Sequence, residues 1–220
     1  MNQLFFFFLV IPAIIYYVSY WPFGTASGLS GDIHMPFDPK YFRLVLDNQK
    51  YMYDYHTKLV ATHPYSAPWF YWLFDWRPIL YYLSYPAPGM TSAFASFTNP
   101  ILTLGGLLCM FFMVYRVFWK KDGRALFIVV GYLSQLLPWT DVSRITFAYH
   151  YFPSTVFLVL AVCHFFNILR QSDPRWKRSV YAFTVACVCL FILFYPKLSG
   201  VAVWNWYGTY VLKWLPSWPF

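Results

Sequence analysis

Long apolar runs separated by short polar links dominate the pattern of this 220-residue chain. A membrane-spanning helix needs about 20 largely apolar residues, with about 17 as the lower limit. Five stretches meet or approach this length: residues 4–20, 99–118, 125–139, 149–169 and 178–195. The third stretch is the shortest, but Pro138 and Trp139 at its end suit a boundary between membrane and water. The pattern therefore predicts an all-α fold, a polytopic transmembrane helix bundle of about five spans.

The first span has a second interpretation. It begins at residue 4 and is followed by the small residues Thr25, Ala26 and Ser27, an arrangement that is also typical of a secretory signal peptide. The residues before the apolar run include no Lys or Arg, which favours a helix that is retained in the membrane.

A different pattern occupies residues 38–58, within the long segment between the first two spans. Asp38 is a candidate N-cap, and Pro39 suits the first helical position. Charged residues recur there at spacings of three or four, at Lys40, Arg43, Asp47, Lys50, Asp54 and Lys58. This spacing predicts an amphipathic helix with i,i+4 ion pairs. Its apolar side either lies in the lipid headgroup layer or packs on the protein's own spans.

The composition agrees with a protein that is surrounded by lipid. Hydrophobic residues make up 60% of the chain and charged residues 11%, whereas a soluble domain has about a quarter charged residues. The high apolar content excludes a disordered tail or a nucleic-acid-binding arm, so we expect no nucleic-acid partner. The four cysteines lie inside apolar segments without a metal-binding spacing, and we expect neither a metal ion nor a cofactor.

The charges predict an orientation, because basic residues prefer cytoplasmic loops. The links 116–124 and 170–178 each hold four basic residues and one Asp, whereas residues 21–98 hold five of each sign. We therefore expect both links and the amino terminus to be cytoplasmic, and the carboxyl terminus to be extracytoplasmic. The predicted organisation is a first transmembrane helix (1–20), an extracytoplasmic aromatic loop (21–98), a four-helix membrane region (99–195) and an extracytoplasmic aromatic tail (196–220).

Two predicted extracytoplasmic segments combine aromatic and basic residues. The first contains His63, Tyr65, Trp69 and Arg77 among several Pro, Trp and Tyr residues. Aromatic faces bind sugar rings, and His or Arg binds an anionic leaving group, although an interfacial aromatic belt has the same composition.

The second segment is a short turn that carries Arg144 and leads into a span through Tyr149 and His150. An Arg there can bind a phosphate with two parallel hydrogen bonds, with Tyr and His as further donors. The alternatives are an i,i+3 pair with Asp141 or contact with lipid headgroups. His164, well inside a predicted span, is expected to be a satisfied packing histidine, with a hydrogen-bond partner for its ring.

Taken together, these segments resemble the carboxyl-terminal four-transmembrane region of the dolichyl-phosphate-mannose–protein mannosyltransferases, glycosyltransferase family 39 of the GT-C superfamily. The resemblance covers about the whole chain, in order and with family-like spacing. The matching stretches are His63-Pro-Tyr-Ser-Ala-Pro-Trp69, Trp76-Arg-Pro-Ile-Leu-Tyr-Tyr82, Asn99-Pro100, Leu137-Pro-Trp139 to Arg144, Tyr149-His-Tyr-Phe-Pro153, Tyr195-Pro196, Gly200 and Trp214-Leu-Pro-Ser-Trp218.

The resemblance implies transfer of mannose from a polyprenyl- or dolichyl-phosphate carrier to Ser or Thr of exported proteins. It implies donor contacts for Arg144, Tyr149 and His150, and a loop role for His63, Tyr65, Trp69 and Arg77. In this family the general base belongs to an Asp-Glu pair in the first outer loop, and all eight acidic residues here are Asp.

Because this pair is missing, the chain is expected to be either a truncated or split piece that pairs with an amino-terminal catalytic partner chain, or a remnant. No catalytic residue is assigned to this chain. The alternative is a non-catalytic membrane subunit that binds a partner or a lipid phosphate. We expect the chain in a bacterial cell membrane, or in the endoplasmic reticulum membrane if it is eukaryotic.

Overall fold

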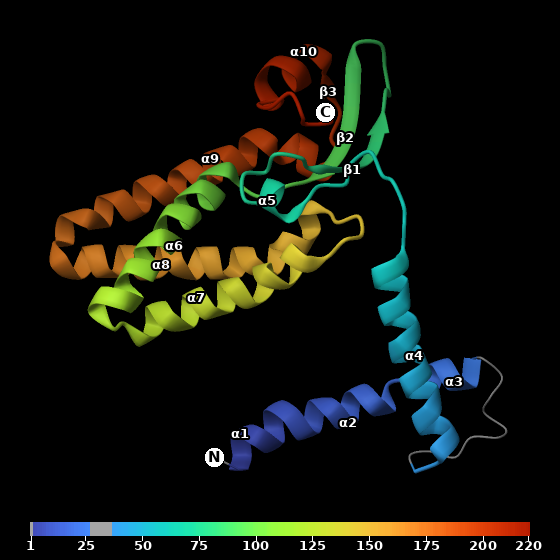
Figure 1. Cartoon of the computed structure of the whole chain (residues 1–220). Helices are drawn as coiled ribbons and strands as arrows, with labels where there is room; N and C mark the ends of the chain where they lie inside the picture. The colour runs from blue at the N-terminus through green and yellow to red at the C-terminus, as the bar shows by residue number, and fades with distance from the viewer. Residues whose placement is uncertain (1, 27–36) are drawn as a thin grey trace. The chain divides into compact units, whose positions relative to one another are not determined.

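The computed structural model describes residues 2–26 and 37–220 and divides into two compact units, Met1–Leu59 and Val60–Phe220 (Figure 1). Residues 27–36, part of the predicted extracytoplasmic loop, lie outside the described residues. Within the described residues, four helices are long and apolar enough to cross a membrane: Phe6–Ala26, Pro100–Lys120, Ala148–Ser172 and Pro174–Ser199.

The third predicted span is a shorter helix than the other four. It forms α7, Gly123–Leu136, which has 14 residues and continues as the 3-10 turn η2, Leu137–Asp141. Pro138 lacks a backbone N–H and cannot donate the next α-helical hydrogen bond, which accounts for the early end of the helix. The prediction of a helical multi-pass membrane protein is confirmed.

The first unit contains one apolar helical stretch and one amphipathic helix. The stretch comprises α1 (Asn2–Phe5), the π-turn η1 (Phe6–Val10), α2 (Ile11–Val18) and α3 (Trp21–Ala26). The amphipathic helix is α4, Pro39–Lys58, and its boundaries agree with the helix predicted over 38–58. The Asp38 carboxylate caps α4 by accepting the Lys40 N–H at 2.7 Å.

Part of the apolar side of α4 packs on the first span. Tyr41 is fully buried, and its hydroxyl donates to the Tyr17 carbonyl at 2.6 Å. Val45 is buried in the same cluster, whereas Tyr51 lies farther along the helix and is exposed. Of the predicted i,i+4 pairs, Asp54–Lys58 forms an ion pair at 3.0 Å, and the ion pairs of the described residues include neither Arg43–Asp47 nor Lys50–Asp54.

The second unit is built on four helices that lie side by side (Figure 1). These are α6 (Pro100–Lys120), α7, α8 (Phe152–Ser172) and α9 (Lys177–Ser199). Helix α8 packs on both α6 and α7, and α9 packs on α6. Gly106 permits the close approach of α6 to α8, because a Cβ there would lie 2.7 Å from the Leu158 Cβ.

A small antiparallel sheet, which the sequence pattern did not predict, lies beyond the end of α9 (Figure 1). Its strands are β1 (Ile79–Ser84), β2 (Met90–Ser96) and β3 (Val203–Trp204), in the order β1-β2-β3. The turn between β1 and β2 includes Gly89 with φ +76°, a conformation that glycine adopts without steric cost. Strand β2 packs on α9, so burial against a distant helix accompanies hairpin formation.

The part of the predicted loop that follows residue 60 and the predicted tail pack on the bundle through separate apolar clusters. Ala67 and Trp72 of the loop belong to the main cluster, which α6, α7 and α8 also form. The tail supplies Leu212 and Trp218 to a second cluster with Phe194 of α9 and residues of the hairpin region. Loop and tail residues are therefore held in fixed positions at the bundle end that includes η2 and the end of α9.

Candidate functional site

Hydrogen bonds fix the loop around Ala67 to the turn that precedes α8. The Ala67 N–H donates to the Thr146 carbonyl at 2.9 Å, and the Ala67 carbonyl accepts the Thr146 hydroxyl at 2.8 Å. The same carbonyl accepts the Trp72 indole N–H at 3.0 Å. All three residues are buried. The two segments predicted from sequence therefore lie against each other, although about 80 residues separate them along the chain.

A cavity of about 350 Å³ lies between these segments. Trp69 comes from the loop, and Trp139 and Arg144 come from the turn after α7. Among the residues that line this cavity, Arg144 is the charged one. The ion pairs of the described residues do not include Arg144, so the alternative pair with Asp141 is not formed. We call this cavity the Arg144 pocket.

Tyr149 and His150 lie in an aromatic cluster that begins directly after the turn and do not line the pocket. The Tyr149 ring stacks on Phe147 with centroids 5.6 Å apart. The ring centroids of His150 and Trp139 are 4.1 Å apart, and Trp139 does line the pocket. The His150 Nδ1 accepts the Phe147 N–H at 3.1 Å. Through Trp139 this cluster is continuous with the wall of the Arg144 pocket.

The remaining loop residues contact the same cluster or support the loop. His63 packs edge-on against Phe147 with centroids 5.1 Å apart, and its Nδ1 accepts the Tyr65 N–H at 3.2 Å. Arg77 donates to the Ser66 carbonyl at 3.5 Å. The structure thus brings Trp69 and Arg144 into one pocket and gathers His63, Tyr149 and His150 around Phe147. Arg77 is a hydrogen-bond donor to the loop backbone and does not line the pocket.

Sequence reasoning missed Asp75, a buried carboxyl group between the loop and β1. Its carboxylate accepts the Thr98 N–H at 3.0 Å and also the Thr98 hydroxyl, while its carbonyl accepts the Trp218 indole N–H at 2.8 Å. Burial raises the pKa of Asp75 to about 7, against the opposing effect of the Thr98 hydrogen bonds. No local pattern predicts this environment, because both partners are distant in sequence.

Sequence reasoning also missed the connections of Asp122, at the other end of α7. One carboxylate oxygen accepts Arg116 Nε at 3.1 Å and Nη2 at 2.8 Å, and it lies 3.0 Å from His164 Nε2. The other oxygen accepts the Arg124 N–H at 3.0 Å and caps α7. Burial alone would raise the pKa of Asp122, but the His164, Arg116 and backbone hydrogen bonds outweigh it and lower this pKa below its usual value.

The contact with Asp122 gives the His164 ring a hydrogen-bond partner, which agrees with the expectation of a satisfied packing histidine. The Asp122-Gly123 sequence before a predicted helix is a local signal for the helix cap. No local signal in the sequence indicates that His164 on α8 would contact Asp122. Within the described residues, no three His, Cys, Asp or Glu side chains come together as a possible metal site.

The sequence model of the C-terminal four-transmembrane region of protein O-mannosyltransferase matches residues 41–218. The chain belongs to this family. The matched residues include the Arg144 pocket, the four bundle helices and most of the tail. The family resemblance predicted from the ordered motifs is therefore confirmed.

Several relatives carry names from the same family. The polyprenol-phosphate-mannose–protein mannosyltransferase of Mycolicibacterium smegmatis is 25% identical over 246 residues, which cover 96% of this chain and 46% of that protein. A protein of the same name from Mycobacterium tuberculosis is 26% identical over 71% of this chain and 32% of its own length. Protein O-mannosyl-transferase 2 of Drosophila pseudoobscura is 34% identical over 44% of this chain and 14% of its own length. The chain spans about half the length of the mycobacterial relative from M. smegmatis, and less of the others.

The fold is also similar to a solved structure, the Saccharomyces cerevisiae protein O-mannosyltransferase Pmt1–Pmt2 complex bound to the sugar donor. The TM-score is 0.64 at 20% sequence identity, and the match covers 80% of this chain and 26% of that one. This similarity supports the helical membrane architecture.

Proposed function

We propose that the chain is the carboxyl-terminal membrane module of a protein O-mannosyltransferase-like glycosyltransferase. Such an enzyme moves mannose from a polyprenyl- or dolichyl-phosphate carrier to Ser or Thr of exported proteins. The Arg144 pocket would hold the phosphate of this donor. The observation that carries the proposal is an Arg without an ion-pair partner in the described residues, in a pocket walled by Trp69 and Trp139.

The chemistry assigns a defined task to Arg144. An acceptor hydroxyl attacks the anomeric carbon of mannose, a carboxylate removes the hydroxyl proton, and the bond from that carbon to the phosphate oxygen breaks. The leaving phosphate gains negative charge as this bond breaks. A guanidinium that donates two parallel hydrogen bonds stabilises this charge more in the transition state than in the bound donor. The donor contacts that the resemblance implies for Tyr149 and His150 would require a ligand that extends past Trp139, because neither residue lines the pocket.

The carboxylate that removes the proton is proposed to come from elsewhere. Since all the acidic residues here are Asp, the sequence does not contain the Asp-Glu pair that the family resemblance implies. We infer that an amino-terminal catalytic portion or partner chain supplies it. The solved relative supports this inference, because it is a complex of two mannosyltransferase chains.

The proposed topology places the Arg144 pocket on the extracytoplasmic side. The basic links 116–124 and 170–178 lie at the opposite end of the helices and are proposed to be cytoplasmic. Residues 21–98 and 196–220 are then proposed to be the extracytoplasmic loop and tail, with residues 1–20 and 99–195 in the membrane. The mycobacterial relatives favour a bacterial cell membrane.

A donor-binding assay and a transfer assay test the proposal. We expect a photoreactive polyprenyl-phosphate-mannose to label the purified chain, and Arg144→Ala to weaken labelling while Arg144→Lys restores part of it. Lys213→Ala is the control, because it removes an exposed cation outside the pocket. Unchanged labelling of Arg144→Ala would refute the phosphate site.

Transfer to a Ser/Thr peptide is measured in membranes of cells that lack the native chain and carry each variant. We expect Arg144→Ala to lower kcat/KM by about a hundredfold or more, as when one donor to a developing oxyanion is removed. Donor labelling without any dependence of transfer on the chain would instead identify a non-catalytic lipid-phosphate-binding subunit.

A further inference from the structure

A second group of cavities lies at the other end of α7 from the Arg144 pocket. The first is a polar cavity of about 470 Å³ whose walls include Arg116, Lys120, Asp122, Arg124 and His164. Three cations face one carboxylate there, so these four side chains carry a formal charge of +2. Asp122 is already bound to Arg116 and His164, and the ion pairs of the described residues include neither Lys120 nor Arg124. We call this cavity the basic pocket.

An apolar groove of about 480 Å³ adjoins the basic pocket. It shares Gly123, Arg124, His164 and Asn167 with that pocket and is otherwise lined by apolar side chains such as Phe127 and Leu160. These residues come from α7 and α8, so the first groove follows the seam between these two helices. Its polar end is the basic pocket.

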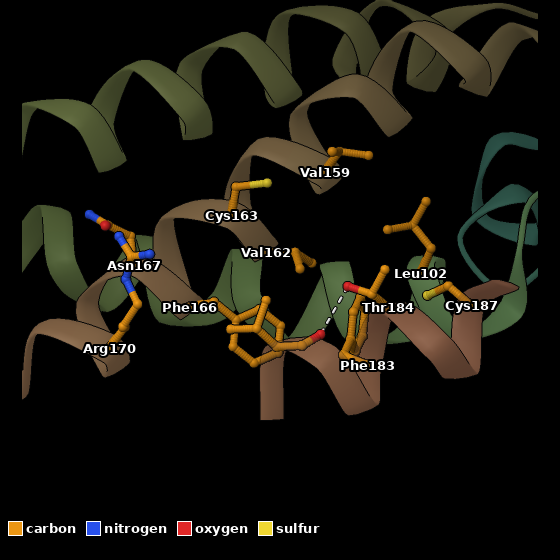
Figure 2. Close-up of a pocket in the computed structure, with 11 residues that line it drawn as sticks. Leu102, Val159, Val162, Cys163, Phe166, Asn167, Arg170, Phe183, Thr184 and Cys187 are labelled. Atoms are coloured by element: carbon orange, nitrogen blue, oxygen red, sulfur yellow. Dashed lines mark hydrogen bonds between the residues drawn. The ribbon is translucent and has the colours of Figure 1, made fainter. Parts of the chain in front are cut away.

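A second apolar groove, of about 500 Å³, lies on the other side of a ridge of α8 that is formed by Cys163 and Asn167. Figure 2 shows Asn167 and Arg170 at one end, with mostly apolar side chains and Thr184 along the remainder toward Leu102. Cys163 and Asn167 line both grooves and are one helical turn apart on α8. All three cavities therefore meet at Asn167.

This combination selects the chemistry of a ligand. A cationic pocket matches an anionic headgroup, and two apolar grooves that start beside it match two hydrocarbon chains. A soluble anion would leave both grooves without an apolar partner. A zwitterionic lipid would place its own ammonium group beside Lys120 and Arg124, which is unfavourable.

We propose that the basic pocket and the two grooves form a binding site for an anionic phospholipid. Its phosphate lies between Lys120 and Arg124, and one acyl chain occupies each groove, on either side of the ridge formed by Cys163 and Asn167. By the proposed topology this lipid belongs to the cytoplasmic leaflet. The site is independent of mannose transfer, because it shares no residue with the Arg144 pocket.

The headgroup part is tested by native mass spectrometry of the detergent-purified chain, titrated with dioleoylphosphatidylglycerol or dioleoylphosphatidylcholine. We expect tighter binding of phosphatidylglycerol, and a loss of about tenfold or more in its affinity when Lys120→Ala and Arg124→Ala are combined. The matched control combines Arg175→Ala and Lys177→Ala, which removes two cations from the other basic link. Equal affinity for both lipids, or an unchanged affinity in the Lys120 and Arg124 double variant, would overturn the proposal.

The acyl-chain part needs a separate variant. Cys163→Trp places a large ring on the ridge between the grooves, so it should lower the affinity for phosphatidylglycerol while the cations remain. Cys189→Trp is the control, because Cys189 is exposed on α9 and lines neither groove. Excess glycerophosphoglycerol, the headgroup without acyl chains, should not displace the lipid. Displacement of the lipid by this excess would identify a soluble-anion site and refute a lipid site.

Discussion

Asp75→Asn should remove the fall in stability that the buried carboxyl causes between pH 4 and pH 8 in the unit formed by residues 60–220. The buried Asp75 carboxyl has a pKa of about 7 in the folded chain, whereas an Asp in an unfolded chain titrates near about 3.9. Between these values the folded state holds a proton that the unfolded state has released. The free energy of unfolding therefore falls as the pH rises through this interval. A difference of about three pH units corresponds to about 4 kcal/mol.

The Asn side chain is a close structural replacement at this position. Asp75 has φ 48°, in the left-handed region that Asn tolerates as well as Asp does. An amide oxygen can accept the Thr98 N–H, and the amide nitrogen can donate to the Thr98 hydroxyl. The variant keeps these hydrogen bonds without a charge to bury. At pH 8 we expect its free energy of unfolding to exceed that of the parent by up to about 4 kcal/mol, and at pH 4 to be similar.

Thermal unfolding in detergent, followed by tryptophan fluorescence between pH 4 and pH 8, measures this difference. For a chain of this size about 4 kcal/mol corresponds to roughly 10 °C in Tm at the alkaline end. Asp141→Asn, which changes an exposed carboxyl of the same unit, should follow the parent at every pH. Parallel pH profiles for Asp75→Asn and the parent would mean that burial does not raise this pKa, and the argument would be wrong.

Two further substitutions test the packing of the bundle. Asp122→Asn should destabilise the chain by about 3 kcal/mol or more, because it leaves the partly buried Arg116 guanidinium without its counter-charge. Asp173→Asn breaks a more exposed pair in the other link and should change stability by less than about 1 kcal/mol. Equal effects of the two substitutions in chemical unfolding would contradict this difference. Gly106→Ala should cost about 1–3 kcal/mol because its Cβ would meet α8 at 2.7 Å, whereas Gly123→Ala, with nothing within 4 Å, should leave Tm unchanged or raise it. A Gly106→Ala protein as stable as the parent would show that the helices separate freely.

The features predicted correctly depend on neighbours in the sequence. Helix α4 begins where Asp38 and Pro39 indicate, because capping and proline geometry act within one helical turn. The family resemblance was likewise predictable, because the order and spacing of the motifs can be read from the sequence without knowing which residues are in contact. By contrast, β1 lacks the alternation typical of a half-buried strand, and its partner β2 packs on the distant helix α9.

The same distinction between local and distant contacts applies to the candidate site. Arg144 and Trp69 were selected for their chemistry, but their common pocket depends on the Ala67–Thr146 hydrogen bonds, which link distant segments. The environment of Asp75 was not predictable, because the chain must fold before Thr98 and Trp218 surround it.

The length of α7 connects the Arg144 pocket with the kind of donor that we propose. A helix of 14 residues is about 21 Å long, less than the hydrocarbon thickness of about 30 Å. The 3-10 segment η2 adds five residues at about 2 Å each, so α7 and η2 together are about 31 Å long and match that thickness. If the Asp122 end lies at the cytoplasmic surface, as the basic links predict, the turn that carries Arg144 follows directly where the chain leaves the hydrocarbon. A phosphate attached to a polyprenyl chain can reach a guanidinium at this boundary while its chain stays in lipid. The position of this turn thus suits a lipid-linked donor on grounds that do not depend on the names of the relatives.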